Sequence, residues 1–423
     1  MKKLKWWGAV GVVAAGIALI GCGSSNSSGD SASLRLINAT NTHASLDMLV
    51  NSAVAVSATA TDTVSAYVSP GSGSNTLQLN DSGSGTALAT TVPTLSAGNH
   101  YTVLAYESGG NIKTVVLPED IATPATGAVT LRLYDAAIEA GKLDVYVTSN
   151  ACTNLSSVAA SASFGTLTAP AAISLTQGVG TFNVCVTGLG SKSDLRLSMP
   201  ITVASQQVAT VVMTPASGGL LLNGGLLIQQ SNFAATRNTN VRMRLAAAVS
   251  GGATVAASAG TTTIDAGSVA PALGSYVLVP ATSALNISVN GSSVGAPAGL
   301  VAGSDVTLLV YGNVGSATAA LITDDNRSPS DSTTVKLRFI NGITGSTGAL
   351  TLTANASQVG SAIASGTASD YASIPGSTTA MNLTLYSSAV AGVYYTGSAT
   401  FSANTVYTVL VGGNVSTPQL LIR

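Results

Sequence analysis

Two short phrases that each occur four times constrain this chain more than any other feature. The first reads SLRLIN, TLRLYD, RMRLAA and KLRFIN, and its fixed Arg is Arg35, Arg132, Arg244 or Arg338. The second alternates apolar residues around a central Thr, which is Thr102, Thr210, Thr307 or Thr408. Both phrases return in the same order at intervals of roughly a hundred residues, the size of a small domain rather than of a solenoid repeat. The sequence therefore predicts four copies of one domain.

Between the two phrases, each copy holds another segment that reads as a β-strand. NTLQLN (75–80), TFNVCVT (181–187), LNISVNG (285–291) and MNLTLYS (381–387) alternate apolar and polar residues with a period of two. A Pro precedes three of them by a few residues, at Pro70, Pro280 and Pro375, whereas the second copy has Pro170 at a longer distance. A Pro at the start of a strand costs no ladder hydrogen bond, so these positions fit the strand prediction.

The local pattern predicts an all-β protein. LDMLVNSAVAVS reads as two strands joined by an Asn51-Ser52 turn, and DAAIEAGK is the nearest approach to a helix. About seven or eight short strands in each unit fit an immunoglobulin-like β-sandwich with its own core. The only Trp residues are Trp6 and Trp7, so the Cys…Trp…Cys pattern of antibody domains is absent.

The expected organisation is a leader, a tether and four sandwiches. TDDNRSPSDS (323–332) reads as a polar linker, and the apolar junction at 218–240 is expected to pack as extra strands. The predicted segments are 1–21 (signal peptide), 22–31 (flexible tether), 32–126, 127–236, 237–331 and 332–423.

The first residues read as an export signal. Lys2, Lys3 and Lys5 precede an uncharged apolar stretch that is too short for a comfortable membrane span. That stretch ends in Leu-Ile-Gly-Cys22, which resembles the lipobox of bacterial lipoproteins. The resemblance implies cleavage before Cys22 and a lipid on its sulfur, and the alternative is an ordinary signal peptide. If the source is Gram-negative, Gly23 favours the outer membrane, so we expect a lipid-anchored protein of the bacterial cell envelope.

Composition narrows the possible partners. Without the three Lys of the leader, thirteen basic residues face seventeen acidic ones, a formal charge of −4. A weakly acidic chain without basic runs argues against nucleic acid as a partner. Charged residues are only 8% of the chain, so the surface has to be built largely from uncharged residues.

Two Cys follow the leader, and we expect them to form a disulfide. Cys152 follows a predicted strand, and Cys185 lies within TFNVCVT on the face opposite Phe182, Val184 and Val186. An even pair in an exported protein favours a disulfide, and a metal site is the weaker alternative because neither His is near a Cys in sequence.

The complete phrase of a unit resembles a known bacterial family. LRLINA…LDMLV, LRLYDA…LDVYV and the closing AGNHYTVLAY are similar to domain of unknown function 4397 (DUF4397). The first copy matches best, and the third lacks the Leu-Asp pair. The resemblance implies secreted or envelope-anchored sandwich domains and supplies no catalytic residues.

No arrangement of residues predicts catalysis, a metal or a cofactor. Only His43 and His100 are available as histidine general bases, and neither is repeated. Asp47 and Asp144 occupy equivalent places in two copies, which favours a structural role over a ligand site. We expect each to accept hydrogen bonds from turn amides or to pair with the nearby Arg35 or Arg132.

The acidic residues of the last predicted linker raise a Ca²⁺ site as an alternative. Asp324, Asp325, Asn326 and Asp331 supply the oxygen ligands that Ca²⁺ prefers, but their spacing fits no EF-hand loop. A solvated linker without metal is the favoured interpretation.

The sequence thus favours a non-catalytic spacer, structural or binding module, anchored in the membrane by its lipid and without a small-molecule cofactor. The first alternative is an adhesin-like binder of an envelope protein or glycan, and the second, disfavoured, is an envelope hydrolase. A spacer predicts an extended array, a binder predicts an exposed apolar or Tyr-lined patch in one copy, and an enzyme predicts a deep polar cleft.

Overall fold

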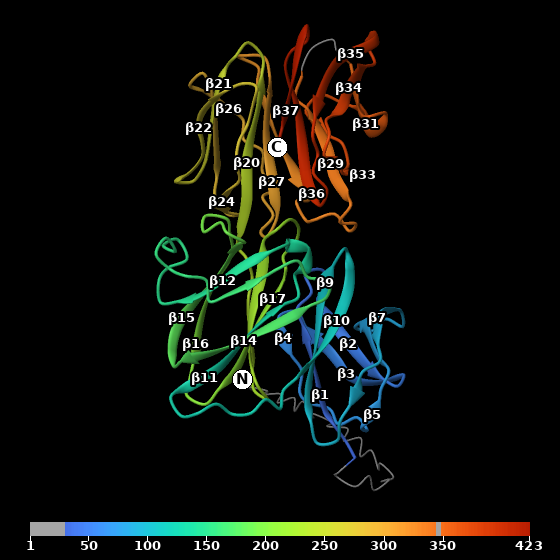
Figure 1. Cartoon of the computed structure of the whole chain (residues 1–423), viewed down its shortest axis with the longest axis vertical. Coiled ribbons are helices and arrows are strands. Elements are labelled where there is room, and N and C mark those ends of the chain that lie inside the picture. Colours follow the sequence, from blue (N-terminus) through green and yellow to red (C-terminus); the bar gives the residue numbers. More distant parts are fainter. Residues whose placement is uncertain (1–29, 344–347) are drawn as a thin grey trace, which may run out of the picture.

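A computed structural model describes residues 30–343 and 348–423. Its strands form four two-layered sandwiches, which confirms the all-β prediction (Figure 1). Among the described residues no helix is long and apolar enough to cross a membrane. The leader, the tether up to Gly29 and the predicted lipid site Cys22 lie outside the described residues.

The first sandwich packs the sheet β10-β9-β1-β4 on the sheet β3-β2-β6-β7, with β5 and β8 paired beside them. The predicted hairpin is present, because Asn51 and Ser52 turn with positive φ between β2 and β3. Its strands are β1 (Ser33–Asn38), β2 (Ser45–Val50), β3 (Ala53–Ala60), β4 (Thr63–Val64), β5 (Gly73–Ser74), β6 (Leu77–Asp81), β7 (Ala87–Thr91), β8 (Thr94–Leu95), β9 (His100–Ser108) and β10 (Asn111–Pro118).

The second sandwich packs β14-β11-β17-β18-β19 on β13-β12-β15-β16. The segment DAAIEAGK forms only a single 3-10 turn, η1 (Ile138–Ala140), and the apolar segment before residue 236 forms strands as expected. The strands are β11 (Ala128–Asp135), β12 (Leu143–Thr148), β13 (Ala162–Phe164), β14 (Ala171–Gly178), β15 (Gly180–Gly188), β16 (Leu195–Val203), β17 (Val208–Pro215), β18 (Leu222–Ile228) and β19 (Phe233–Thr236).

The third sandwich packs β23-β20-β27-β28, with β24 also on β20, against β22-β21-β25-β26. Its strands are β20 (Asn240–Val249), β21 (Thr254–Ala259), β22 (Thr262–Val269), β23 (Ala272–Leu273), β24 (Val277–Pro280), β25 (Leu285–Val289), β26 (Ser292–Val294), β27 (Asp305–Gly312) and β28 (Thr318–Asp324).

The fourth sandwich repeats this plan, with β32-β29-β36-β37 and β33 packed against β31-β30-β34-β35. Its strands are β29 (Thr334–Asn341), β30 (Leu350–Ala354), β31 (Ser357–Ile363), β32 (Thr367–Ala368), β33 (Ala372–Pro375), β34 (Met381–Ser387), β35 (Val390–Ala399), β36 (Thr405–Asn414) and β37 (Thr417–Ile422).

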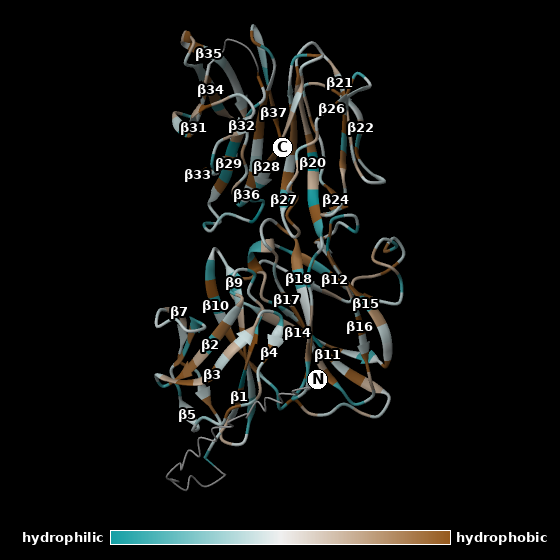
Figure 2. Cartoon of the chain, turned by 180° about the vertical axis from the view of Figure 1, so that it is seen from behind, coloured by the Kyte–Doolittle hydropathy of each residue, from teal (hydrophilic) through white to brown (hydrophobic). Residues whose placement is uncertain are grey.

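Each sandwich has an apolar core of its own, built from alternate residues of its strands. Leu34 and Leu36 of β1 point into the first core, whereas Ile37 faces the other way. The same alternation appears as banded hydropathy along the strands in Figure 2. A unit of this size can bury enough apolar surface to fold around a separate core.

The four sandwiches are arranged in two pairs, not in a line (Figure 1). In each pair the sheets that carry the repeated Arg face one another, and we call them the inner sheets. An apolar cluster with Ile37, Leu104, Tyr134 and Val212 joins the first and second sandwiches. A second cluster joins the third and fourth sandwiches, and it contains Ala246, Ala248, Leu309, Ile340 and Leu410. The extended array that a simple spacer predicts is therefore not observed.

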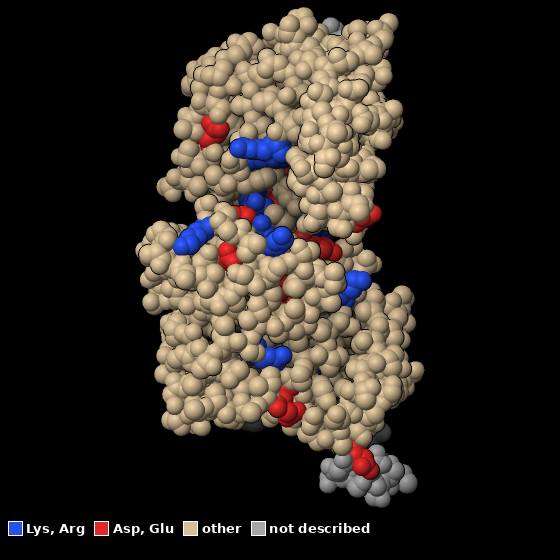
Figure 3. All heavy atoms as spheres, in the orientation of Figure 1, with Lys and Arg blue, Asp and Glu red and all other residues tan. Residues whose placement is uncertain are grey.

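The two pairs meet at a polar waist, where the second sandwich contacts the third and the segment that leads to the fourth. Arg242 pairs with Asp194 at 3.3 Å, and Arg327 pairs with Glu139 at 3.2 Å. Lys, Arg, Asp and Glu gather across the middle of the face in Figure 3, while most of that face is uncharged.

The second sandwich contains the expected disulfide between Cys152 and Cys185. Phe182, Val184 and Val186 pack in the core, and Cys185 packs on the opposite side of β15 with Tyr146 and Leu155. The bond ties the irregular segment after β12 to β15, across a sequence separation of 33 residues.

We predict that the chain from Asp30 onward has no reactive thiol when it is denatured without reductant, and two after reduction. In the chain-entropy model a loop of this size contributes about 3–4 kcal/mol, so reduction is expected to lower the unfolding free energy of the second sandwich by that amount. Thiol titration and denaturant unfolding with and without reductant measure both effects. Two thiols before reduction would contradict the disulfide.

Candidate functional site: arginine clusters between paired sandwiches

The two repeated phrases are neighbours in space. The strand with the Arg and the strand with the Thr form a parallel pair in every sandwich, and the register places the two residues opposite one another. The partners are Arg35 and Thr102, Arg132 and Thr210, Arg244 and Thr307, and Arg338 and Thr408. Since side chains alternate along a strand, an Arg between two apolar core residues has to face out of its own sandwich and toward the paired one.

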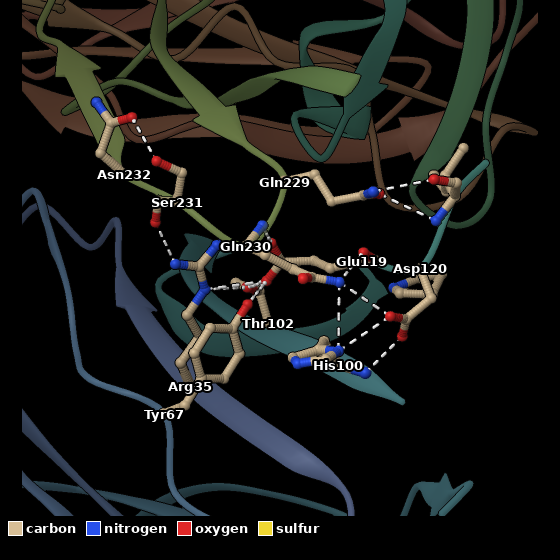
Figure 4. Close-up of polar contacts among 12 residues, drawn as sticks. Arg35, Tyr67, His100, Thr102, Glu119, Asp120, Gln229, Gln230, Ser231 and Asn232 are labelled. Carbon is tan, nitrogen blue, oxygen red and sulfur yellow. Dashed lines mark hydrogen bonds and ion pairs between the residues drawn. The ribbon is translucent and has the colours of Figure 1, made fainter. Parts of the chain in front are cut away.

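The first cluster is a buried ion pair with a hydroxyl and a ring around it (Figure 4). Arg35 pairs with both oxygens of Glu119, Nε to Oε1 at 2.9 Å and Nη2 to Oε2 at 2.6 Å. Its Nε also donates to Thr102 Oγ1 at 2.9 Å. The guanidinium lies 4.6 Å from the centre of the Tyr67 ring, and the Tyr67 hydroxyl donates to Glu119. Burial, followed by the charge of Glu119, raises the pKa of Tyr67, so its hydroxyl stays protonated.

This cluster reaches the second sandwich through the turn after β18. Arg35 Nη1 donates to the carbonyl oxygen of Ser231, and the amide of Gln230 donates to Glu119 Oε2 at 2.6 Å. Beside them, Gln229 makes two hydrogen bonds with the backbone of Ile121. The ion pair of the first sandwich therefore holds a turn of the second in place.

The third and fourth sandwiches share a single acid. Asp324, which is 1% exposed, accepts hydrogen bonds from Tyr276 at 2.5 Å and Thr307 at 2.6 Å. Arg244 lies 3.9 Å from this carboxylate, and Arg338 of the fourth sandwich also pairs with it. Arg244 in turn donates to Thr408 of the fourth sandwich at 2.9 Å. One carboxylate thus compensates two buried guanidinium groups, one from each sandwich.

The second sandwich keeps the Arg and the Thr but not the rest of the cluster. Register places Ser174 opposite Arg132, where the first sandwich has Tyr67 opposite Arg35. Gln229 stands two residues beyond the partner of Thr210, as Glu119 stands two beyond the partner of Thr102. Arg132 donates only to the Pro118 carbonyl oxygen among the described residues, at 3.4 Å, and burial lowers its pKa.

Sequence reasoning missed the Tyr and the acid of these clusters. Tyr67, Tyr276 and Tyr371 each lie a few residues before Pro70, Pro280 or Pro375, and each ring packs against the repeated Arg of its own sandwich. The sequence contains a signal for these rings, because a Tyr recurs a few residues before each of these three Pro residues. Glu119 and Asp324 share no surrounding phrase, so only the strand register identifies them as equivalent.

Asp47 and Asp144 accept hydrogen bonds from turn amides and do not pair with Arg35 or Arg132. Asp47 accepts from the amides of Ala58 and Gly83, and the bond from Ala58 is the main cause that lowers its pKa. Asp144 accepts from the amide of Gly190 at 2.8 Å and from the hydroxyl of Ser163. The structure therefore shows hydrogen bonds from turn amides to these carboxylates and not the alternative ion pairs with Arg.

The linker prediction was wrong for Asp324, because this residue ends β28 and is buried instead of solvated. Its neighbour Asp325 pairs with Arg327 and Lys336, which outweigh burial and lower the pKa of Asp325 to about 2. Asp331 accepts a bond from the amide of Thr333. Among the described residues, no three side chains of the His, Cys, Asp and Glu types are grouped so that they could hold a metal ion.

Both His residues pair with an Asp. His43 Nδ1 lies 2.6 Å from Asp81, and His100 Nδ1 lies 2.9 Å from Asp120. Within the described part of the chain, no hydrogen bond joins either imidazole to a Ser or Cys side chain.

A strand-end Asx turn recurs in three sandwiches. The side-chain oxygens of Asn38, Asp135 and Asn341 each accept a bond from the amide two residues on. Asn38 and Asn341 also donate to a carbonyl oxygen, which the carboxylate of Asp135 can do only when protonated. Burial raises the pKa of Asp135 to about 6.

The fold and these clusters define a class, a tandem β-sandwich protein whose units pair through buried Arg residues. Residues 32–146 match the family model described as "Domain of unknown function (DUF4397)", and that stretch belongs to this family. It covers the first sandwich and the strands β11 and β12 of the second. No curated protein sequence matches the chain. One similar solved structure is "The Bacillus anthracis TIE protein", at 10% identity over 90% of this chain and 67% of that chain, with a TM-score of 0.15.

We predict that Glu119→Gln destabilises the first pair by about 3–5 kcal/mol, because it leaves Arg35 buried without a counter-charge. Denaturant unfolding measures the change in unfolding free energy. Two spectroscopic probes, one in each pair of sandwiches, distinguish the unfolding of the first pair from that of the second. Arg132→Met is the matched control, since Arg132 has no acid to leave unpaired, and its effect is expected to be much smaller. Equal losses in the two variants would contradict the role of the ion pair.

We predict that Asp135→Asn stabilises the protein by about 1–3 kcal/mol at pH 7. The unfolded carboxyl ionises near its ordinary pKa of 3.8, while the folded one holds its proton up to about pH 6, so wild-type stability falls as pH rises between these values. The advantage of the variant should therefore be small below pH 4 and complete above pH 6.

Thermal unfolding between pH 3 and pH 8 tests this sign. The converse variant, Asn341→Asp, places an acid at the equivalent strand end of the fourth sandwich and should lose stability over the same range. A pH-independent gain for Asp135→Asn would show that the titration of Asp135 is not its cause.

Proposed function

We propose that the protein is a lipid-anchored component of the bacterial cell envelope that acts as a non-catalytic structural or binding module. Anchoring rests on the leader and on the lipobox-like sequence before Cys22. The disulfide supports an oxidising compartment outside the cytoplasm. The membrane is then the first partner, reached through the lipid, and the outer membrane is the expected location for a Gram-negative source.

The non-catalytic part of the proposal rests on one observation: the acids of the clusters and both imidazoles are already bound to other groups of the protein. Glu119 and Asp324, the acids of the clusters, are bound to guanidinium and hydroxyl groups across sandwich interfaces. The imidazoles are held by Asp81 and Asp120. Groups that are committed in this way stabilise a fixed arrangement of domains, which suits a scaffold better than an active site.

A binding role is the second candidate, and a patch on the fourth sandwich favours it. Tyr386 and Val393 are cross-strand partners on β34 and β35, with 40% and 52% of their surface exposed, and Val390 is exposed nearby. These strands lie at the opposite end of the molecule from the start of β1 (Figure 1). An adhesin-like contact with an envelope protein or glycan would place its binding surface there.

We predict that Cys22→Ser abolishes membrane association. Wild-type protein should stay in the membrane fraction after a high-salt wash and enter the detergent phase of a phase partition, because at least two acyl chains give stable anchoring. A Gly23→Ala variant, next to the lipid site, is the control and should remain anchored. Retention of the Cys22→Ser protein in membranes after the wash would overturn the lipid anchor.

A further inference from the structure

A polar pocket lies at the waist, where the second, third and fourth sandwiches meet. Its volume is about 350 Å³, at the lower end of the range for small-molecule sites. Arg242 and Arg244 line it from β20, and Thr408 and Arg423 from the fourth sandwich, while Asp194 lines it from the second. The hollow in the middle of Figure 3 lies in the same band of charged side chains.

Positive charge exceeds negative charge around this pocket. Arg242 has two acids, Asp305 at 2.6 Å and Asp194 at 3.3 Å. Arg244, however, shares Asp324 with Arg338.

Arg423, in the lining of the pocket, donates to a backbone oxygen and to no Asp or Glu side chain among the described residues. Its side chain is exposed, and its one hydrogen bond among the described residues goes to the backbone oxygen of Leu273, at 3.0 Å. A planar guanidinium in this state is suited to bind a carboxylate through two parallel hydrogen bonds.

The rest of the lining favours hydroxyl groups over rings. Ser193, Ser275 and Asn326 supply hydroxyl and amide groups. The ring of Tyr276 is not available for stacking, because Arg242 and Arg244 both pack on it, at 4.7 Å and 4.6 Å from its centre. A ligand would therefore be held by hydrogen bonds and charge.

We propose that this pocket binds a hydroxylated carboxylate about the size of a monosaccharide, such as a uronic acid. The carboxylate pairs with Arg423, and the hydroxyl groups of the ligand bond to the Ser and Asn side chains of the lining. The inference goes beyond the envelope role and does not depend on the lipid, so its failure would leave the anchoring proposal untouched.

The test is calorimetric titration of the chain from Asp30 onward, which keeps all four sandwiches, with glucuronate, glucose and inorganic phosphate. We expect glucuronate to bind with a Kd of about 1 mM or tighter, and glucose to bind at least about tenfold more weakly. Arg423→Gln should weaken glucuronate binding by at least about tenfold. Lys113→Gln removes an exposed positive charge from the first sandwich, which contributes no residue to the lining of the pocket, and should leave the Kd unchanged.

Thermal unfolding of both variants checks that they fold, and Arg423 is exposed enough for its replacement to be tolerated. Absence of glucuronate binding at about 10 mM would overturn the proposal, as would an unchanged Kd in Arg423→Gln. Glucose binding as tightly as glucuronate, or phosphate binding more tightly, would also overturn it, because the site would then not select a hydroxylated carboxylate.

Discussion

A buried guanidinium group on the outward face of three of the four inner sheets, from Arg35, Arg244 and Arg338, is the constraint from which the arrangement of this protein follows. Ionised groups are costly to remove from water unless an acid and further hydrogen bonds compensate them. Arg35 meets that requirement with Glu119, Thr102 and the turn at Ser231, which belongs to the paired sandwich. The inner sheets thus pack against each other with an apolar cluster and a charged cluster side by side, which explains why the units pair instead of forming a line.

The two pairs of sandwiches differ in how acids compensate the repeated Arg residues. In the first pair one Arg has one acid, and the second sandwich has replaced its acid by Gln229 and its Tyr by Ser174. In the second pair Arg244 and Arg338 both depend on Asp324. The first pair is consequently asymmetric, whereas the second is tied by one shared carboxylate. Duplication of a unit has therefore not preserved the chemistry of its interface equally in all copies.

The charged residues that remain are concentrated where the pairs meet. On the face shown in Figure 3, most of the charged side chains lie in a band across the waist, and most of the rest of that face is uncharged. The exposed Tyr386 and Val393 offer a different surface at the far end of the fourth sandwich. Scaffold, contact patch and pocket thus occupy separate parts of the molecule.

Period-two alternation determined the strands, and recurrence of the Arg and Thr phrases determined that one all-β unit is repeated, because both depend on local side-chain patterns. The disulfide followed from the count of Cys residues, and a structural role for Asp47 and Asp144 from their equivalent positions. Tertiary structure alone decided the pairing of sandwiches, the burial of Asp324 in place of a solvated linker, and the grouping of Arg423 with Arg242 and Arg244. These features join residues from different units, and a pattern that repeats within each unit carries no information about which copies face one another.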